Sequence, residues 1–96
     1  TVTIPTGYVN NKYVSCDFGG SIVLNPGADY HNFELCTITG TLTIASDYNQ
    51  FIGCRFTGAV TLSSGAEYNV FIGCIFTAGL TNSSANTTNE IANNIG

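Results

Sequence analysis

Three carboxylates recur beside tyrosines along this chain, and they are the residues best placed to do chemistry. The pairs are Asp29-Tyr30, Asp47-Tyr48 and Glu67-Tyr68, separated by 18 and 20 residues. Hydrolysis of a glycosidic bond uses two carboxyl groups, about 5 to 10 Å apart, that flank the bond. No second, facing acid repeats with these three. We therefore expect no catalytic residue and a chain that is not an enzyme.

Asparagines follow two of these tyrosines directly. Tyrosine rings combine an apolar body with a polar tip, and beside carboxylates and amides they are typical of a sugar-binding groove. The expected ligand-binding residues are Tyr30, Tyr48, Tyr68, Asn49, Asn69, Asp29, Asp47 and Glu67. Two other roles stay open: the tyrosines could pack between protomers, and stacked asparagine amides could stabilise a turn. His31 replaces the asparagine of the other copies, which favours a place in that amide column over a general base.

Four cysteines mark the organisation of the chain. They are Cys16, Cys36, Cys54 and Cys74, with spacings of 20, 18 and 20 residues. Zinc ligands come in close pairs, so these spacings match no zinc site. Cysteines stacked in register point in parallel, which disfavours the torsion of roughly 90° in a disulfide. We expect a structural column of buried, free thiols, with no metal and no other cofactor.

The cysteines belong to an internal repeat of 18 to 20 residues that covers the chain. Each copy has an aromatic residue three positions before the cysteine and a large apolar residue two positions after it, as in Phe51-Ile52-Gly53-Cys54-Arg55-Phe56. A second stretch alternates aliphatic residues with polar ones, as in Val60-Thr61-Leu62, which is the pattern of a half-buried strand. Each copy therefore predicts two short strands.

This period is too short for helix-pair repeats, so we expect an all-β fold, a single-stranded parallel β-solenoid of about five coils. A right-handed helix is favoured because the copies vary in length and lack a sustained six-residue period. We expect residues 1–96 to form a single domain. Equivalent residues then stack in columns about 4.8 Å apart. The expected interior columns, besides the cysteines, are Tyr13/Phe33/Phe51/Phe71/Ile91, Phe18/Ile38/Phe56/Phe76, Ile22/Leu42/Val60/Leu80 and Ile4/Leu24/Ile44/Leu62.

Threonines offer an alternative face. Two columns of them would project outward: Thr3, Thr43, Thr61 and Thr81, and Thr39, Thr57 and Thr77. Regular threonine arrays on solenoids resemble the water-ordering faces of several antifreeze proteins. Val23 and Gly19 interrupt the two columns, which favours a plain β-surface.

Charge limits the partners. Only 8% of the residues are charged, the net charge is -4, and Lys12 and Arg55 are the only Lys and Arg residues. Nucleic-acid binding requires a basic surface, so DNA and RNA are excluded as partners. No apolar run approaches the length of a membrane span, so we expect no membrane insertion.

The run Tyr-Asn-x-Phe-Ile-Gly-Cys-x-Phe-Thr-Gly-x-Val-Thr-Leu at residues 48–62, which largely recurs from Tyr68 onward, resembles the right-handed parallel β-helices of phage tail spikes and tail fibres. The resemblance covers essentially the whole chain. It implies an extracellular, trimeric part of a virion that binds or cleaves cell-surface polysaccharide.

The first functional expectation is thus a structural and receptor-binding part of a phage fibre or spike, with surface glycan as its ligand. One alternative is an ice-binding or other surface-recognition solenoid that uses the threonine face, and another is a fragment of a polysaccharide-cleaving spike. The chain has neither a capping helix nor a charged terminal coil to cover the apolar ends of the stack. We therefore expect a segment of a longer protein or a protomer of a homotrimer.

Overall fold

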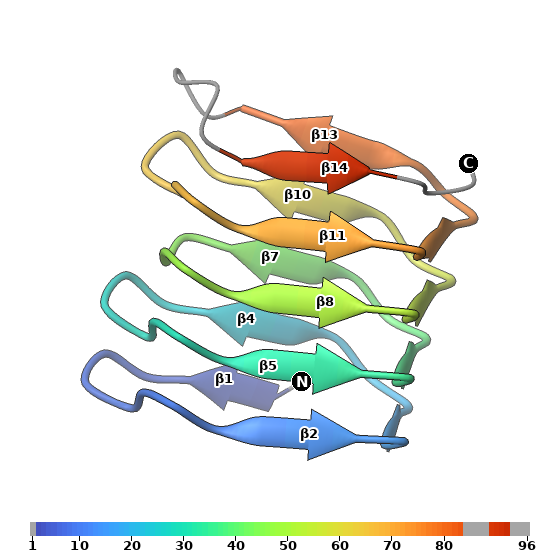
Figure 1. Cartoon of the computed structure of the whole chain (residues 1–96), viewed down its shortest axis with the longest axis horizontal. Coiled ribbons are helices and arrows are strands. Elements are labelled where there is room, and N and C mark those ends of the chain that lie inside the picture. Colours follow the sequence, from blue (N-terminus) through green and yellow to red (C-terminus); the bar gives the residue numbers. More distant parts are fainter. Residues whose placement is uncertain (1, 84–88, 93–96) are drawn as a thin grey trace.

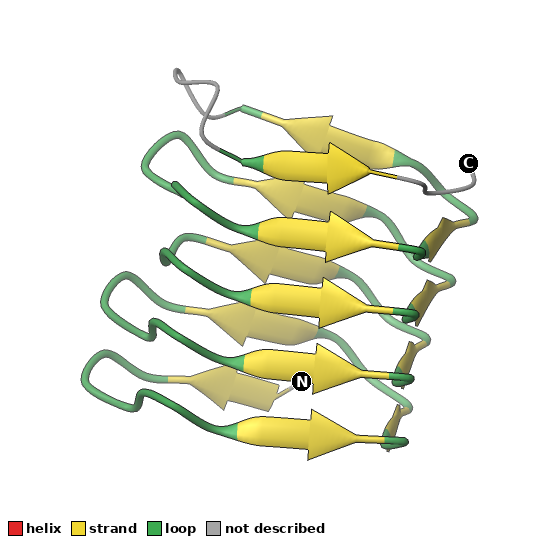
Figure 2. Cartoon of the chain, in the orientation of Figure 1, coloured by secondary structure: helices red, strands yellow, loops and turns green. Residues whose placement is uncertain are grey.

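The computed structural model describes residues 2–83 and 89–92, without the side chains of Glu90 and Ala92. Over these residues the chain forms fourteen short strands and no helix (Figure 2). The strands build three sheets. Sheet A contains β1 (Val2–Ile4), β4 (Ile22–Leu24), β7 (Leu42–Ile44), β10 (Val60–Leu62) and β13 (Leu80–Asn82). Sheet B contains β2 (Lys12–Val14), β5 (Asn32–Glu34), β8 (Gln50–Ile52), β11 (Val70–Ile72) and β14 (Glu90–Ala92). Sheet C contains β3 (Asp17–Phe18), β6 (Thr37–Ile38), β9 (Arg55–Phe56) and β12 (Ile75–Phe76).

The parallel β-solenoid predicted from the repeat is confirmed. Each strand pairs in parallel with the equivalent strand one coil away, in all three sheets (Figure 1). The 18-residue copy keeps this register, since β7 pairs with β4 and β10 as the other strands of sheet A do. The two residues that this copy lacks are therefore absent from a turn and not from a strand.

Two expectations need correction. The chain completes about four coils and not five, because β1 to β12 give four coils with a strand in every sheet, while β13 and β14 extend sheets A and B only. Each coil also has three strands and not two. The strands of sheet C are two residues long, which is too short to show an alternating pattern in the sequence.

Figure 1 shows the hand of the solenoid. The strands of sheet B lie in front and point to the right, those of sheet A lie behind and point to the left, and the chain rises from β1 to β13. Seen from the top, the chain turns counterclockwise as it rises toward the viewer. The solenoid is therefore right-handed, as is nearly every crossover between parallel strands.

The core consists of the predicted columns. Phe33, Phe51 and Phe71 are fully buried, and their ring centroids lie 4.8 and 4.7 Å apart in a stack inside sheet B. The strand pairings place the members of all the predicted aromatic and aliphatic columns opposite one another. Burial weakens toward the ends, where Tyr13 is half-buried and Ile91 is 42% exposed. Stacking thus buries the side chains that a single coil would leave in water.

Glycines allow the coils to approach where sheet C leads into sheet A. A Cβ atom on Gly58 would overlap the carbonyl oxygen of Gly40 and lie 2.6 Å from its carbonyl carbon. A Cβ atom on Gly40 would lie 2.5 Å from the carbonyl carbon of Gly20. These contacts are with backbone, which cannot move aside without breaking the stack. Glycine is therefore required by the coil spacing at Gly40 and Gly58, whereas the fourth copy carries Ala78 at the equivalent position.

Candidate functional site

Tyr30, Tyr48 and Tyr68 form a column of parallel rings, here called the tyrosine ladder, on the turns that lead from sheet A to sheet B. The ring centroids of Tyr30 and Tyr48 lie 4.9 Å apart, and those of Tyr48 and Tyr68 lie 5.0 Å apart, with planes inclined by 5° and 8°. The three residues are 53, 43 and 45% exposed. These turns form the left edge of the molecule in Figure 1. Because each ring covers a face of the next, the ladder presents ring edges and hydroxyl groups to solvent.

The backbone of the tyrosine ladder is in the left-handed region. The φ angles of Tyr30, Tyr48 and Tyr68 are 64°, 61° and 57°. Asn10, with φ of 62°, takes the equivalent place in the first coil, since its N–H donates to the carbonyl of Asp29 as the N–H of Tyr30 donates to that of Asp47. Asparagine tolerates this conformation far better than a bulky residue does. The turn therefore holds aromatic residues where its backbone favours asparagine.

The acidic residues lie directly beside the tyrosine ladder and are half-buried. The Oδ1 atom of Asp29 accepts the N–H of Asp47, and the Oδ1 atom of Asp47 accepts the N–H of Glu67, both at 2.9 Å. Desolvation in the column raises the pKa of Tyr48, and the neighbouring phenols and carboxylates raise it further. The phenol of Tyr48 thus stays protonated at neutral pH and can both donate and accept a hydrogen bond.

The asparagines lie inside the solenoid and not on its surface. Asn49 and Asn69 are fully buried. The Oδ1 atom of Asn69 accepts two hydrogen bonds from Asn49, one from its backbone N–H at 2.9 Å and one from its side-chain amide at 3.0 Å. The Oδ1 atom of Asn89 accepts the same two bonds from Asn69. The predicted amide column is thus present, and His31 stands in it, since its N–H donates to the Oδ1 atom of Asn49. As a correction to the expected ligand-binding set, these two side chains are committed to the column and unavailable to a surface ligand.

Ser46 accepts hydrogen bonds from two asparagines of this column, a role that its position in the sequence does not predict. It is 1% exposed. Its hydroxyl accepts from the amide of Asn49 at 2.9 Å, and its carbonyl accepts from the amide of Asn69 at 3.0 Å. The signal for it is a polar residue before Asp47, where the neighbouring copies carry Ala28 and Ala66.

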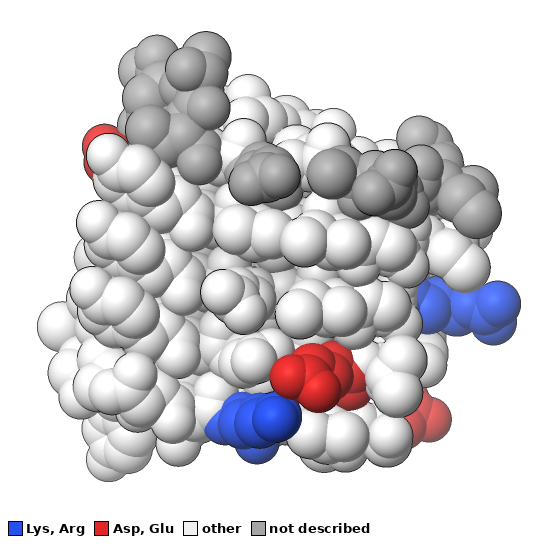
Figure 3. All heavy atoms as spheres, viewed as in Figure 1, with Lys and Arg blue, Asp and Glu red and all other residues white. Residues whose placement is uncertain are grey.

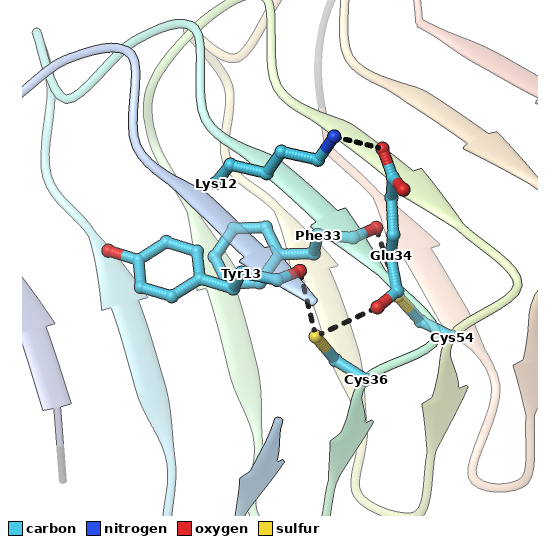
Figure 4. Close-up of polar contacts among 6 residues, drawn as sticks. All are labelled: Lys12, Tyr13, Phe33, Glu34, Cys36 and Cys54. Atoms are coloured by element: carbon cyan, nitrogen blue, oxygen red, sulfur yellow. Dashed lines mark hydrogen bonds and ion pairs between the residues drawn. The ribbon is translucent and has the colours of Figure 1, made fainter. Parts of the chain in front are cut away.

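The cysteines form the expected column of free thiols. Each inner thiol donates to a carbonyl one coil back, as Figure 4 shows for Cys36 with Tyr13 and Cys54 with Phe33, at 3.2 and 3.3 Å. Burial raises the pKa of Cys36. The hydrogen bond with the Cys74 thiol, together with burial, raises the pKa of Cys54. The same hydrogen bond lowers the pKa of Cys74. The thiols of Cys36 and Cys54 are therefore packed groups that stay protonated at neutral pH.

The threonine columns lie on two different parts of the coil. The first runs through sheet A in the order Thr3, Val23, Thr43, Thr61 and Thr81. The second, Thr39, Thr57 and Thr77, is exposed and follows the strands of sheet C. Thr43 and Thr61 are only half-exposed, and Val23 interrupts their column.

The surface over the described residues is flat and sparsely charged. Figure 3 shows few charged atoms among the uncharged ones on the face made by sheet B, and Lys12 of this sheet pairs with Glu34 at 3.5 Å (Figure 4). No pocket opens anywhere on the part of the chain that is described. Over the same residues no three His, Cys, Asp or Glu side chains gather in a way that could hold a metal ion. Nor does any described segment form a helix long and apolar enough to cross a bilayer. A ligand of this surface would have to bind along a row of exposed groups.

Comparison with known proteins places the chain in no family: no family model, no curated protein and no solved structure matches it.

Proposed function

We propose that this solenoid is a structural segment of an extracellular fibre or spike, of the phage kind that its repeat resembles, and that it binds surface polysaccharide through the tyrosine ladder. One observation carries the proposal. Tyr30, Tyr48 and Tyr68 are half-exposed, in register and held at positive φ. A backbone outlier that recurs on the surface supports a functional role, because strain persists where something else requires it.

The energetics support a role beyond that of the turn. A left-handed conformation costs an ordinary residue roughly 1 to 2 kcal/mol, and a stacked aromatic pair returns about 0.5 to 1.5 kcal/mol. The ladder has three left-handed residues, which cost about 3 to 6 kcal/mol, and two stacked pairs, which return about 1 to 3 kcal/mol, so folding alone gains nothing from tyrosine at these positions. Asn10 shows that the same turn forms without an aromatic ring.

The geometry of the tyrosine ladder favours an extended ligand. Its rings repeat every 4.9 to 5.0 Å along the solenoid axis, and no pocket accompanies them over the described residues. Hydroxyl groups in such a row can exchange hydrogen bonds with the hydroxyls of successive sugars, and the half-buried carboxylates beside them add acceptors. A linear polysaccharide that lies along the axis would use all three rings at once.

The test is a glycan array probed with the 96-residue chain and two variants. Tyr48→Asn removes the central ring but keeps a residue that suits positive φ, and we expect at least a tenfold loss of binding. The matched control is Thr57→Asn, an exposed substitution on another part of the coil that should leave binding unchanged. Absence of any glycan bound by the wild type, or equal binding by Tyr48→Asn, would reject the proposal.

The assembly and the reaction class are tested separately. A fibre protomer should elute as a homotrimer, with a mass near three times 10.1 kDa by light scattering. We propose that the chain is not an enzyme, so a bound polysaccharide should release no new reducing ends.

The threonine alternative has weaker support, since its columns lie on different parts of the coil and one is interrupted by Val23. Thermal hysteresis without glycan binding would favour it.

A further inference from the structure

His31 is a buried titratable residue within the amide column. It is 1% exposed and directly precedes β5. Its backbone N–H donates to the Oδ1 atom of Asn49 at 3.0 Å, which fixes it in the same register as the asparagines of the later coils. The side chain reaches back to the first coil, where its Nε2 atom lies 2.8 Å from the carbonyl oxygen of Tyr8. His31 thus links the turn between β1 and β2 to the second coil.

The hydrogen bonds of the ring define its proton state. A carbonyl oxygen can only accept, so Nε2 carries the hydrogen in the bond to Tyr8. In the neutral ring the Nδ1 atom then has no hydrogen, and it is buried without a hydrogen-bond partner. A second proton would have to bind at Nδ1. The imidazolium would therefore place an N–H where the structure provides no acceptor, which is a costly arrangement for a buried donor.

The groups around the ring do not offset this cost. From its own turn, Asp29 is a carboxylate that favours the cation. From β2, the Tyr13 ring lies with its centroid 6.4 Å away, and from the next coil Asn49 is neutral. Burial outweighs the attraction of Asp29 and the Tyr8 hydrogen bond, so the pKa of His31 lies below its ordinary value.

We propose that His31 makes the first coil a pH-sensitive element, closed on the second coil when the ring is neutral and released when the ring is protonated. The doubly protonated ring can satisfy its Nδ1–H only by leaving the column. Leaving breaks the bond to Tyr8 and removes the residue that ends the amide column. The neighbouring backbone bonds from Asn10 to Asp29 and from Asn32 to Asn11 then lose their support. The later coils carry asparagine at this position and have no such group.

The sign of the pH effect follows from linkage. A histidine whose pKa is lower in the folded state binds the proton more readily when unfolded. The stabilising contribution is complete above the ordinary pKa of about 6.5 and is lost as the pH falls from there toward the folded-state pKa. Within that window the equilibrium constant for unfolding should rise by up to about tenfold for each unit by which the pH falls.

The experiment compares the 96-residue wild type with His31→Asn, which installs the residue of the other coils and cannot titrate. Urea unfolding of both at about pH 7.5 and about pH 5 should show a larger loss of stability in the wild type, since the carboxylates are common to both proteins. Hydrogen exchange should show faster opening of the Asn10 and Asn32 amides at the lower pH in the wild type only, after correction for intrinsic rates. Equal pH dependence in the two proteins would overturn the proposal.

A direct titration keeps the proposal falsifiable if His31→Asn fails to fold. His31 is the only histidine, so its ring resonances in the NMR spectrum of the wild type are unambiguous. We expect a folded-state pKa below the ordinary value and, through the titration, growing exchange between two states of the first coil. A pKa at or above the ordinary value, or no change in the Tyr8 to Asn11 amides, would reject the proposal. His31→Gln provides a second neutral variant.

Discussion

The side-chain amide of Asn49 and its backbone N–H both donate to one atom, the Oδ1 of Asn69, at 3.0 and 2.9 Å. One carbonyl oxygen of the next coil thus holds two donors of the previous coil in a fully buried place. This arrangement repeats between Asn69 and Asn89. The amide column is therefore a polar spine that fixes the register of the turns as the apolar columns fix that of the strands.

Asn69→Ala should be strongly destabilising. It leaves the two donors of Asn49 and the carbonyl of Ser46 without their partner in the interior, and each such group costs about 1 to 3 kcal/mol. We expect a loss of about 3 kcal/mol or more in the free energy of unfolding, measured by urea denaturation. Gln50→Ala, an exposed change in β8, serves as the control and should stay within about 0.5 kcal/mol of the wild type. Similar effects of both changes would mean that the column contributes little.

Gly58→Ala should destabilise the chain because the added methyl group has no room, and not because alanine disfavours the backbone angles at this position. The new methyl group would meet the backbone of Gly40, and relieving such overlap costs about 1 to 3 kcal/mol or more. Gly65→Ala is the matched control, since a Cβ atom there has no neighbour within 4 Å. Thermal unfolding of the two variants should separate them by several degrees. A Gly58→Ala protein as stable as Gly65→Ala would contradict the close approach of the coils.

Phe51→Ala and Ile52→Ala test which face of β8 is inside. Phe51 is fully buried between Phe33 and Phe71, and its truncation should cost about 3 to 5 kcal/mol. Ile52, the next residue, points outward and is 38% exposed, so its truncation should cost less than about 1 kcal/mol. Chemical denaturation gives both values. A reversed order would imply a register shifted by one residue.

Thiol reactivity should divide the cysteines into two classes. Cys16 is half-buried in the first coil, whereas Cys36, Cys54 and Cys74 are buried and donate to backbone carbonyls one coil back. Because all three inner thiols are buried and a reagent reaches them only when the coils open, they should react slowly at neutral pH. A disulfide-exchange reagent should label one cysteine quickly and the other three only on unfolding. Denatured protein, in which all four react alike, is the control, and rapid labelling of all four in the native state would argue against the buried column.

The sequence by itself determined the solenoid, because a strand that pairs with its own equivalent one coil away must repeat its side chains at the coil period. The columns of Phe33 with Phe51 and of Cys36 with Cys54 follow from that period. Short strands such as Thr37–Ile38 were not recognisable, since two residues show no alternation. The number of complete coils likewise depends on which strands pair at the ends.

Only the tertiary structure decided which polar columns face inward. Tyr48 and Asn49 are neighbours in the sequence, yet Tyr48 is exposed at positive φ and Asn49 is buried. The direction of a side chain at a turn is set by the backbone angles and by contacts with the coils on either side, and neither is written in the local pattern. The same contacts give the Nε2 atom of His31 a hydrogen bond to the carbonyl of Tyr8, a residue 23 positions earlier in the chain. They leave the Nδ1 atom of the ring without a hydrogen-bond partner.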